Sequence, residues 1–165
     1  MSRYLKISWL SVLVIAALVY GAAAIGSLFT AAGIPGWYQS IAKPAWTPPG
    51  SVIGAVWTVL FTLIAVAAIL VWNTRPRGRD NVIAMEMLSI NLLFNVLWSY
   101  IFFMRHSIGG ALLEMIFLWF SILACIVLFW RINRVAGLLL LPYILWVSFA
   151  FYLNWTIAML NGAIS

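Results

Sequence analysis

Residues 51–72 read SVIGAVWTVLFTLIAVAAILVW and contain no charged side chain. A run of about 20 apolar residues is the length that an α-helix needs to cross the hydrocarbon core of a bilayer. Inside that core the backbone amides and carbonyls must bond to one another, which a helix achieves within a single segment. The stretch therefore predicts a membrane-spanning helix.

Four further apolar runs lie on either side of this one. They are Ile7–Ala31, Val82–Met104, Ile108–Trp130 and Gly137–Leu160. The 165-residue chain is 66% hydrophobic and 7% charged, whereas soluble domains are about half apolar and about a quarter charged. The short links Asn73–Asn81, Arg105–Ser107 and Arg131–Ala136 favour antiparallel neighbours. We therefore predict an all-α membrane protein, a bundle of five transmembrane helices forming one domain over residues 1–165.

The first link, Gly33–Gly50, has an unusual composition: GIPGWYQSIAKPAWTPPG. Its four prolines and three glycines are incompatible with a regular helix, and Ser51 is a candidate cap for the helix that follows. Trp37, Tyr38 and Trp46 make it too aromatic for a solvated linker. We expect an ordered loop that covers one end of the bundle. The alternative is an interfacial loop whose aromatic side chains anchor in the headgroups.

The basic residues are divided unequally between the two sides of the predicted bundle. One side carries Arg3, Lys6, Arg75, Arg77, Arg79, Arg131 and Arg134, and the other carries Lys43 and Arg105. Cytoplasmic loops are enriched in Lys and Arg, so the amino terminus is predicted to be cytoplasmic in an integral, multi-pass protein of a prokaryotic cell membrane. The basic residues form no stripe, which argues against a nucleic-acid partner.

Small residues recur at four-residue spacing in the first span. Ala17 with Gly21, and Ala22 with Gly26, would allow another helix to approach closely. Tight packing within the bundle is the preferred interpretation, and the seam of a homodimer is the alternative. On the last span, Pro142 frees a backbone carbonyl and predicts a kink.

Polar and aromatic side chains inside the spans indicate a binding cavity. Asn91, Asn95 and Trp98 share one face of the third span. Asn91 is interpreted as a hydrogen bond between helices, whereas Asn95 is either that or a ligand contact. Trp57 and Trp146, like Trp98, lie away from the interfaces where tryptophan is usual. A cavity lined by apolar and aromatic side chains with a few polar groups is typical of a small-molecule site.

Catalytic groups of the common kinds are not evident in the sequence. The acids Asp80, Glu86 and Glu114 form no catalytic carboxylate pair, and Arg105 is a candidate partner for Glu114. His106 is the only histidine, and one histidine cannot build a metal site. We therefore expect no acid–base centre, no metal and no required cofactor.

Three motifs together resemble a known family. The run Trp37-Tyr38-x-x-Ile41-x-Lys43-Pro44-x-Trp46-Thr47-Pro48-Pro49-Gly50, followed by Trp57, resembles the TspO/MBR family of tryptophan-rich sensory proteins, translocator proteins and peripheral benzodiazepine receptors. Asn91-x-x-Phe94-Asn95-x-x-Trp98 is similar to its third helix, and Leu141-Pro142-Tyr143-x-x-Trp146 to its fifth. The resemblance extends over roughly Trp37 to Ile157.

The resemblance implies a membrane receptor or sensor for porphyrins, such as protoporphyrin IX and haem-related tetrapyrroles, and for benzodiazepine-type molecules. A transporter of tetrapyrroles or other small hydrophobic molecules is the alternative. By motif position the ligand-binding residues are Tyr38, Trp46, Pro48, Ile53, Trp57, Asn95, Trp98, Trp146, Phe149, Ala150 and Leu153. Trp57 and Trp146 are the candidates for light-dependent porphyrin degradation. Trp98 departs from the Phe that is common in the family, and the animal cholesterol motif is not evident after Asn154.

The charge bias predicts which ends are accessible from outside the cell. In intact cells, a protease-cleavable tag at Ser2 should be protected and one at Ser165 should be removed, because the positive side stays in the cytoplasm. Cleavage is followed by immunoblotting, with permeabilised cells as the control. If only the Ser2 tag were removed, the predicted orientation would be wrong and the amino terminus would lie outside the cell.

Overall fold

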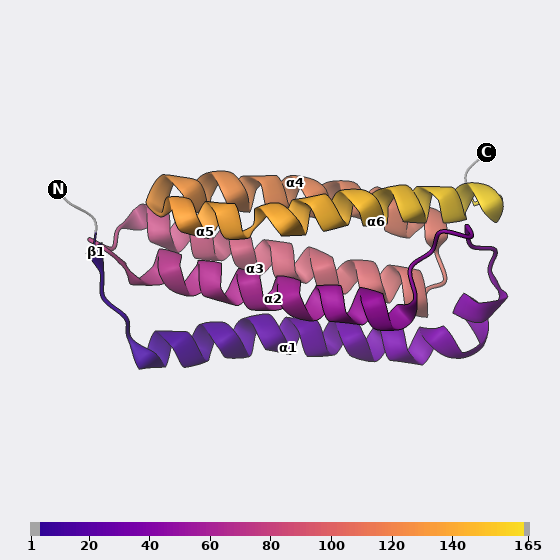
Figure 1. The fold of residues 1–165 in the computed structure, drawn as a ribbon, viewed down its shortest axis with the longest axis horizontal. Helices are drawn as coiled ribbons and strands as arrows, with labels where there is room; N and C mark the ends of the chain where they lie inside the picture. Colours follow the sequence, from indigo (N-terminus) through magenta and orange to yellow (C-terminus); the bar gives the residue numbers. More distant parts are fainter. Residues whose placement is uncertain (1–3, 164–165) are drawn as a thin grey trace.

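The apolar runs form helices of membrane-spanning length in the computed structural model, which describes residues 4–163 (Figure 1). The first four spans are α1 (Trp9–Gly33), α2 (Gly50–Asn73), α3 (Arg79–Ser99) and α4 (Ile108–Ile132). The fifth consists of α5 (Arg134–Leu139) and α6 (Leu141–Leu160). Short π-helical turns, η1 (Ile34–Tyr38) and η2 (Tyr100–Met104), extend α1 and α3. The prediction of five transmembrane helices is confirmed.

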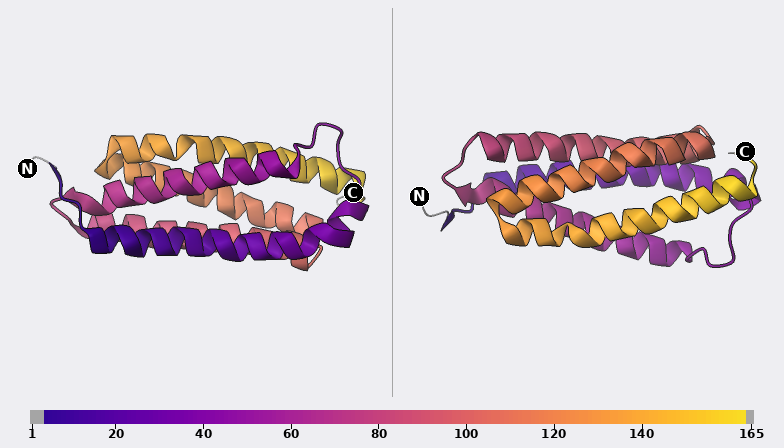
Figure 2. Two further views of the ribbon diagram at one scale, coloured as in Figure 1. Left: turned by 60° about the horizontal axis from the view of Figure 1, so that its bottom comes forward. Right: turned by 90° about the horizontal axis from the view of Figure 1, so that it is seen from above.

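Consecutive spans run antiparallel around the bundle (Figures 1 and 2). Helix α1 packs on α2 and α3, α3 on α4, and α4 on both halves of the fifth span. Helix α2 packs on α5, but it diverges from α6 towards the end of the bundle where the 41–49 loop lies. The bundle is therefore closed at one end and wider at the other.

The narrow end of the bundle is filled by apolar side chains. Ile64, Leu88, Ile122 and Phe129 are all fully buried there. Many large apolar side chains elsewhere are exposed, among them Leu145. A bilayer accounts for that exposure, because lipid tails are as apolar as the side chains that face them.

A two-stranded ribbon at the narrow end was not predicted from the sequence. Strand β1 (Tyr4–Leu5) pairs antiparallel with β2 (Thr74–Arg75). Asn73 holds the start of α1 beside it, because its side-chain oxygen accepts from the Ser8 amide at 2.9 Å and its carbonyl from the Lys6 amide at 2.9 Å. These contacts join the chain before α1 to the link after α2.

The charges divide between the two ends of the bundle as the sequence predicts. The narrow end carries Lys6, Arg75, Arg77, Arg79, Arg131 and Arg134, and the wide end carries Lys43 and Arg105. Arg3 lies outside the described residues. The side of the membrane on which each end lies stays a prediction.

The boundaries of the first link differ from the sequence prediction. The expected irregular stretch Gly33–Gly50 begins with helical turns, since η1 continues α1 across a kink at Pro35 and Gly36. Gly36 has φ 85°, a left-handed conformation that glycine adopts without a steric penalty. Ser51 is not the cap of α2, because the helix begins at Gly50 with Pro49 in the N-cap position.

The fifth span begins earlier than predicted, at Arg134 rather than Gly137. The preceding link is only Asn133, whose side-chain oxygen accepts from the amides of Val135 and Ala136 and so caps α5. The predicted kink is present, because the helix is interrupted at Leu140 just before Pro142.

A buried hydrogen-bond network joins three helices near the middle of the bundle. The Asn95 amide donates to the Tyr143 hydroxyl at 3.0 Å, and that hydroxyl donates to the Asn91 side-chain oxygen at 3.3 Å. Asn91 donates in turn to Ser121 at 2.8 Å. The interpretation of Asn91 as a link between helices is confirmed, and Tyr143 is the residue through which α3 and α6 are joined.

Replacing Tyr143 tests how much this network stabilises the bundle. Tyr143→Phe should lower the free energy of unfolding in detergent by about 1 kcal/mol, because the side chains of Asn91 and Asn95 each lose a partner. The matched control is Tyr20→Phe, which removes an exposed 3.0 Å bond to Thr62. That change should stay within about 0.5 kcal/mol. If thermal unfolding showed that both variants lose the same stability, the buried network would contribute no more than an exposed hydrogen bond.

Candidate functional site

A cavity of about 720 Å³ occupies the wide end of the bundle. All four helices α1–α4 and helix α6 contribute to its walls, together with η1 and η2, and the 41–49 loop covers part of it. The volume falls within the range of about 300–1,000 Å³ typical of small-molecule sites. The cavity follows from the divergence of α2 and α6, which leaves the space between them unfilled.

Most of the residues predicted to bind a ligand line this cavity. They are Tyr38, Pro48, Ile53, Trp57, Asn95, Trp98, Trp146, Phe149, Ala150 and Leu153. Trp46 is the exception: it is not among the lining residues, is 43% exposed and stacks on Tyr152 with ring centroids 5.3 Å apart. The motif placed it in the pocket, but its ring lies against the outer part of α6 instead.

Helix α1 supplies a wall that sequence reasoning missed. Gly26, Ser27 and Thr30 line the cavity from this side. A Cβ added to Gly26 would lie 3.4 Å from the Ser99 hydroxyl of α3, whereas one added to Gly21 would have no neighbour within 4 Å. Gly26 therefore packs within the bundle as predicted. Its small-residue spacing was the available signal that α1 lies close to the cavity.

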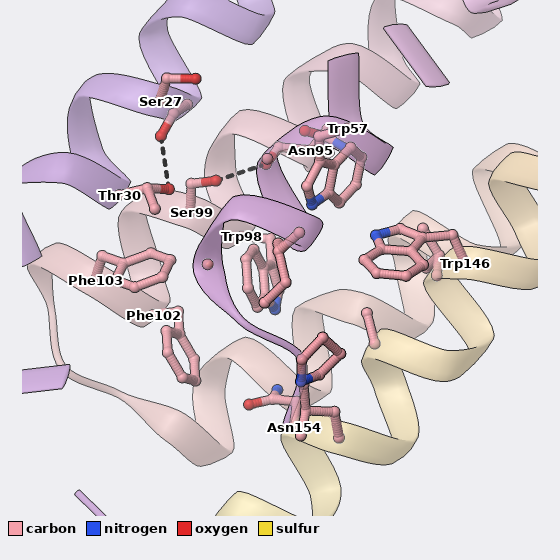
Figure 3. A pocket seen from close by; sticks show the side chains of 18 of the residues that line it. Ser27, Thr30, Trp57, Asn95, Trp98, Ser99, Phe102, Phe103, Trp146 and Asn154 are labelled. Atoms are coloured by element: carbon pink, nitrogen blue, oxygen red, sulfur yellow. Dashed lines mark hydrogen bonds between the residues drawn. The ribbon is translucent and has the colours of Figure 1, made fainter. Parts of the chain in front are cut away.

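The in-span tryptophans meet around the cavity. Trp57 and Trp146 point towards one another from α2 and α6, and Trp98 lies between them and the loop end (Figure 3). Trp98 stacks on Phe102, with centroids 5.2 Å apart and planes inclined by 16°. Trp146 packs against Phe149 at 5.3 Å. The cavity is thus bounded on several sides by flat aromatic surfaces, which suit a flat ligand.

Several polar atoms in the cavity wall are buried without a partner. They are the indole nitrogens of Trp98 and Trp146 and both side-chain polar atoms of Asn154. Asn154 is only 2% exposed and was not among the predicted site residues. Asn95 differs from it, because its amide nitrogen is already bonded to Tyr143. Asn95 is therefore a helix contact that also lines the cavity, and its contact with a ligand stays a prediction.

The acid within the fourth span has no salt bridge. Glu114 is 6% exposed, and both of its carboxyl oxygens are buried without a partner. Arg105, the candidate partner, is exposed in the link before α4, so that expectation is wrong. Glu114 does not line the cavity. Over residues 4–163 no group of three His, Cys, Asp or Glu side chains could hold a metal ion.

The loop over the cavity is held by specific contacts. The Asn161 side chain at the end of α6 accepts from the Ala42 amide at 3.0 Å and donates to its carbonyl at 2.9 Å. Lys43 donates to the carbonyls of Tyr38 and Ile41 at 2.6 and 2.9 Å. Lys43 and Pro48 also line the cavity. The structure thus favours an ordered cover over a headgroup anchor.

Comparison with known proteins gives a consistent result. The model of the TspO/MBR family matches residues 13–160. Tryptophan-rich protein TspO of Chlorobaculum tepidum is 37% identical over 82% of this chain and 86% of its own. A tryptophan-rich sensory protein of Cereibacter sphaeroides is 32% identical over 76% and 77%. Human translocator protein is 29% identical over 81% and 79%.

The double contact of Asn161 predicts a measurable change in loop opening. Asn161→Leu should increase chymotrypsin cleavage after Trp46 about five- to ten-fold, because two hydrogen bonds that close the loop are lost. Cleavage of purified protein in detergent is followed by mass spectrometry. Thr156→Val is the control, since that hydroxyl bonds only to the Tyr152 carbonyl of its own helix. Equal cleavage of both variants would show that other contacts hold the loop.

Proposed function

This chain belongs to the TspO/MBR family, and from that premise we propose that it is a membrane receptor or sensor that binds a porphyrin in the cavity beneath the 41–49 loop. The relatives named as sensory and translocator proteins support the receptor or sensor role. Protoporphyrin IX and haem-related tetrapyrroles are the proposed ligands, and benzodiazepine-type molecules are proposed to occupy the same space.

The observation that carries the proposal is the cavity with its in-span tryptophans. Trp57, Trp98 and Trp146 present aromatic surface around one space of about 720 Å³. An indole offers a large apolar face that stacks on a flat macrocycle. Most of the remaining wall is apolar, with Asn95, Ser99 and Asn154 as its buried polar side chains. Such a site can hold a flat hydrophobic molecule and needs no cofactor to do so.

Transport is the second candidate function, and the helix interruptions favour it. The fifth span is broken at Leu140, and interrupted spans near a site are a feature of transporters. The packed narrow end argues against it, because the fully buried Ile64, Leu88 and Phe129 leave no path beyond the cavity. Binding therefore takes precedence over transport in this proposal. We place the protein in a prokaryotic cell membrane with its amino terminus in the cytoplasm, as the charge distribution suggests.

Light-dependent porphyrin degradation is an extension of the same proposal. It assigns a photochemical role to Trp57 and Trp146, whose indoles face one another across the cavity. An indole is readily oxidised, whereas a phenyl ring in its place can only stack. Since this chemistry needs no acid–base pair, the lack of such a pair in the cavity wall does not oppose it.

An absorbance titration of the purified protein with protoporphyrin IX in the dark tests binding. We expect a saturable shift of the Soret band, reduced about ten-fold in affinity by the double variant Trp57→Ala/Trp146→Ala, because both stacking faces are lost. Trp9→Ala is the control, since Trp9 is 79% exposed at the narrow end. A titration without saturation would contradict the proposed function.

Illumination tests the photochemical extension separately. Trp57→Phe and Trp146→Phe should keep most of the affinity, because stacking area is largely retained. The light-driven loss of the Soret band should slow several-fold at equal porphyrin occupancy. Bleaching that is as fast in both variants as in the native protein would leave the two tryptophans as binding residues only.

A further inference from the structure

Asn154 is in a chemically unusual position. Its side-chain nitrogen and oxygen are both buried without a partner, in a side chain that is 2% exposed and lines the cavity. An amide removed from water without hydrogen bonds is strongly unfavourable. Each such group in a native structure needs an explanation, and a bound molecule that supplies the missing hydrogen bonds is one. The cavity is where such a partner can enter.

A second unpartnered donor lines the same cavity. In Figure 3 the indole nitrogen of Trp98 points towards Asn154, across the loop end of the cavity. That nitrogen is also buried and without a partner. The two residues come from different helices, α3 and α6, which fold together around the cavity. Together they offer donors from the indole and the amide, and one acceptor from the amide oxygen.

We propose that Asn154 and Trp98 form a polar subsite that recognises a ligand edge carrying a hydrogen-bond donor and acceptor side by side, as in a lactam or a carboxylic acid. This inference rests on the proposed function, because the edge belongs to the flat ligand held between the tryptophans. The side-chain amide is itself such a pair, so two parallel hydrogen bonds can form with a matching group. The Trp98 N–H donates to the second lone pair of the same acceptor oxygen.

The position of the subsite fits a ligand that stacks deeper in the cavity. Asn154 lies eight residues beyond Trp146 on α6, about 12 Å along the helix axis. A planar ligand between Trp57 and Trp146 can therefore extend one edge towards Asn154. A ligand group that displaces water from such a subsite keeps its affinity only if it reproduces the hydrogen bonds of that water. The subsite thus selects among flat ligands of similar apolar surface.

Binding of four tetrapyrroles to the purified full-length protein in detergent tests the proposal. Etioporphyrin has only alkyl substituents, and protoporphyrin IX dimethyl ester has acceptors but no edge donor. Protoporphyrin IX adds carboxylic acids, and biliverdin dimethyl ester carries terminal lactams without free acids. The native protein should bind at least one of the last two about ten-fold more tightly than the dimethyl ester of protoporphyrin IX. The compound that binds more tightly shows whether the subsite recognises the carboxylic acid or the lactam.

Two variants connect this preference to the two residues. Asn154→Leu should abolish the preference over the dimethyl ester while changing the affinity for etioporphyrin by less than about two-fold. Trp98→Phe should reduce the preference several-fold, because an aromatic ring stays and the N–H is lost. Etioporphyrin serves as the internal control for correct folding. Trp9→Phe, at the narrow end, is the matched control for Trp98→Phe and should change neither affinity.

The outcomes separate the subsite from the proposed function. A native protein that binds all four compounds with similar affinity, or an Asn154→Leu variant that keeps the preference, overturns the subsite and leaves porphyrin binding intact. A lower melting temperature of Asn154→Leu with an unchanged preference assigns Asn154 to helix packing, which also overturns it. A native protein that binds none of the four, etioporphyrin included, overturns the proposed function and the subsite with it.

Discussion

The free-energy cost of burying an unpaired polar group determines where the polar side chains lie in this bundle. A hydrocarbon environment gives no water to a stranded amide or hydroxyl. Asn91 and Asn95 therefore meet at the Tyr143 hydroxyl, which accepts from Asn95 and donates to Asn91. Asn91 donates in turn to Ser121. This network fixes how α3, α4 and α6 sit relative to one another. Trp98, Trp146 and Asn154 keep unpaired polar atoms in the cavity wall, whereas the unpaired carboxyl of Glu114 lies outside it.

The fixed arrangement of these helices explains the shape of the wide end. The fifth span changes course at Leu140, before Pro142, so α5 packs on α2 while α6 leaves it. The space that opens is bounded by aromatic rings and covered by a loop held at Ala42 by Asn161. The cover is held to the end of α6 by these two hydrogen bonds and to η1 by the bond from Lys43 to the Tyr38 carbonyl.

In the proposed function, recognition of the ligand depends on apolar surface and hydrogen bonding. Glu114, the acid within the fourth span, does not line the cavity and has no cationic partner. The tryptophans supply stacking area, and the indole and amide groups supply direction. Membership of the TspO/MBR family agrees with a receptor or sensor that recognises a small molecule in this way.

The sequence by itself determined the five spans, the unequal charge of the two ends and part of the cavity wall. It could do so because membrane spans depend on local composition, and because the motifs around Trp57, Asn95 and Trp146 are local. Trp46 belonged to the same motif, yet its ring stacks on Tyr152 outside the cavity. The direction of a loop side chain depends on where α6 passes, which no local pattern encodes.

Other features were decided only when the helices came together. The contact of Gly26 with Ser99 and the hydrogen bonds of Asn161 to Ala42 join residues that are far apart in the chain. The unpaired carboxyl of Glu114 likewise depends on how the helices pack. Asn154 shows the difference most clearly. Its sequence position predicts only a polar residue within a span, but tertiary packing leaves both of its polar atoms unpaired in the cavity that Trp98 also lines. Whether a buried amide is satisfied depends on the geometry of neighbouring helices, and that geometry exists only in the folded bundle.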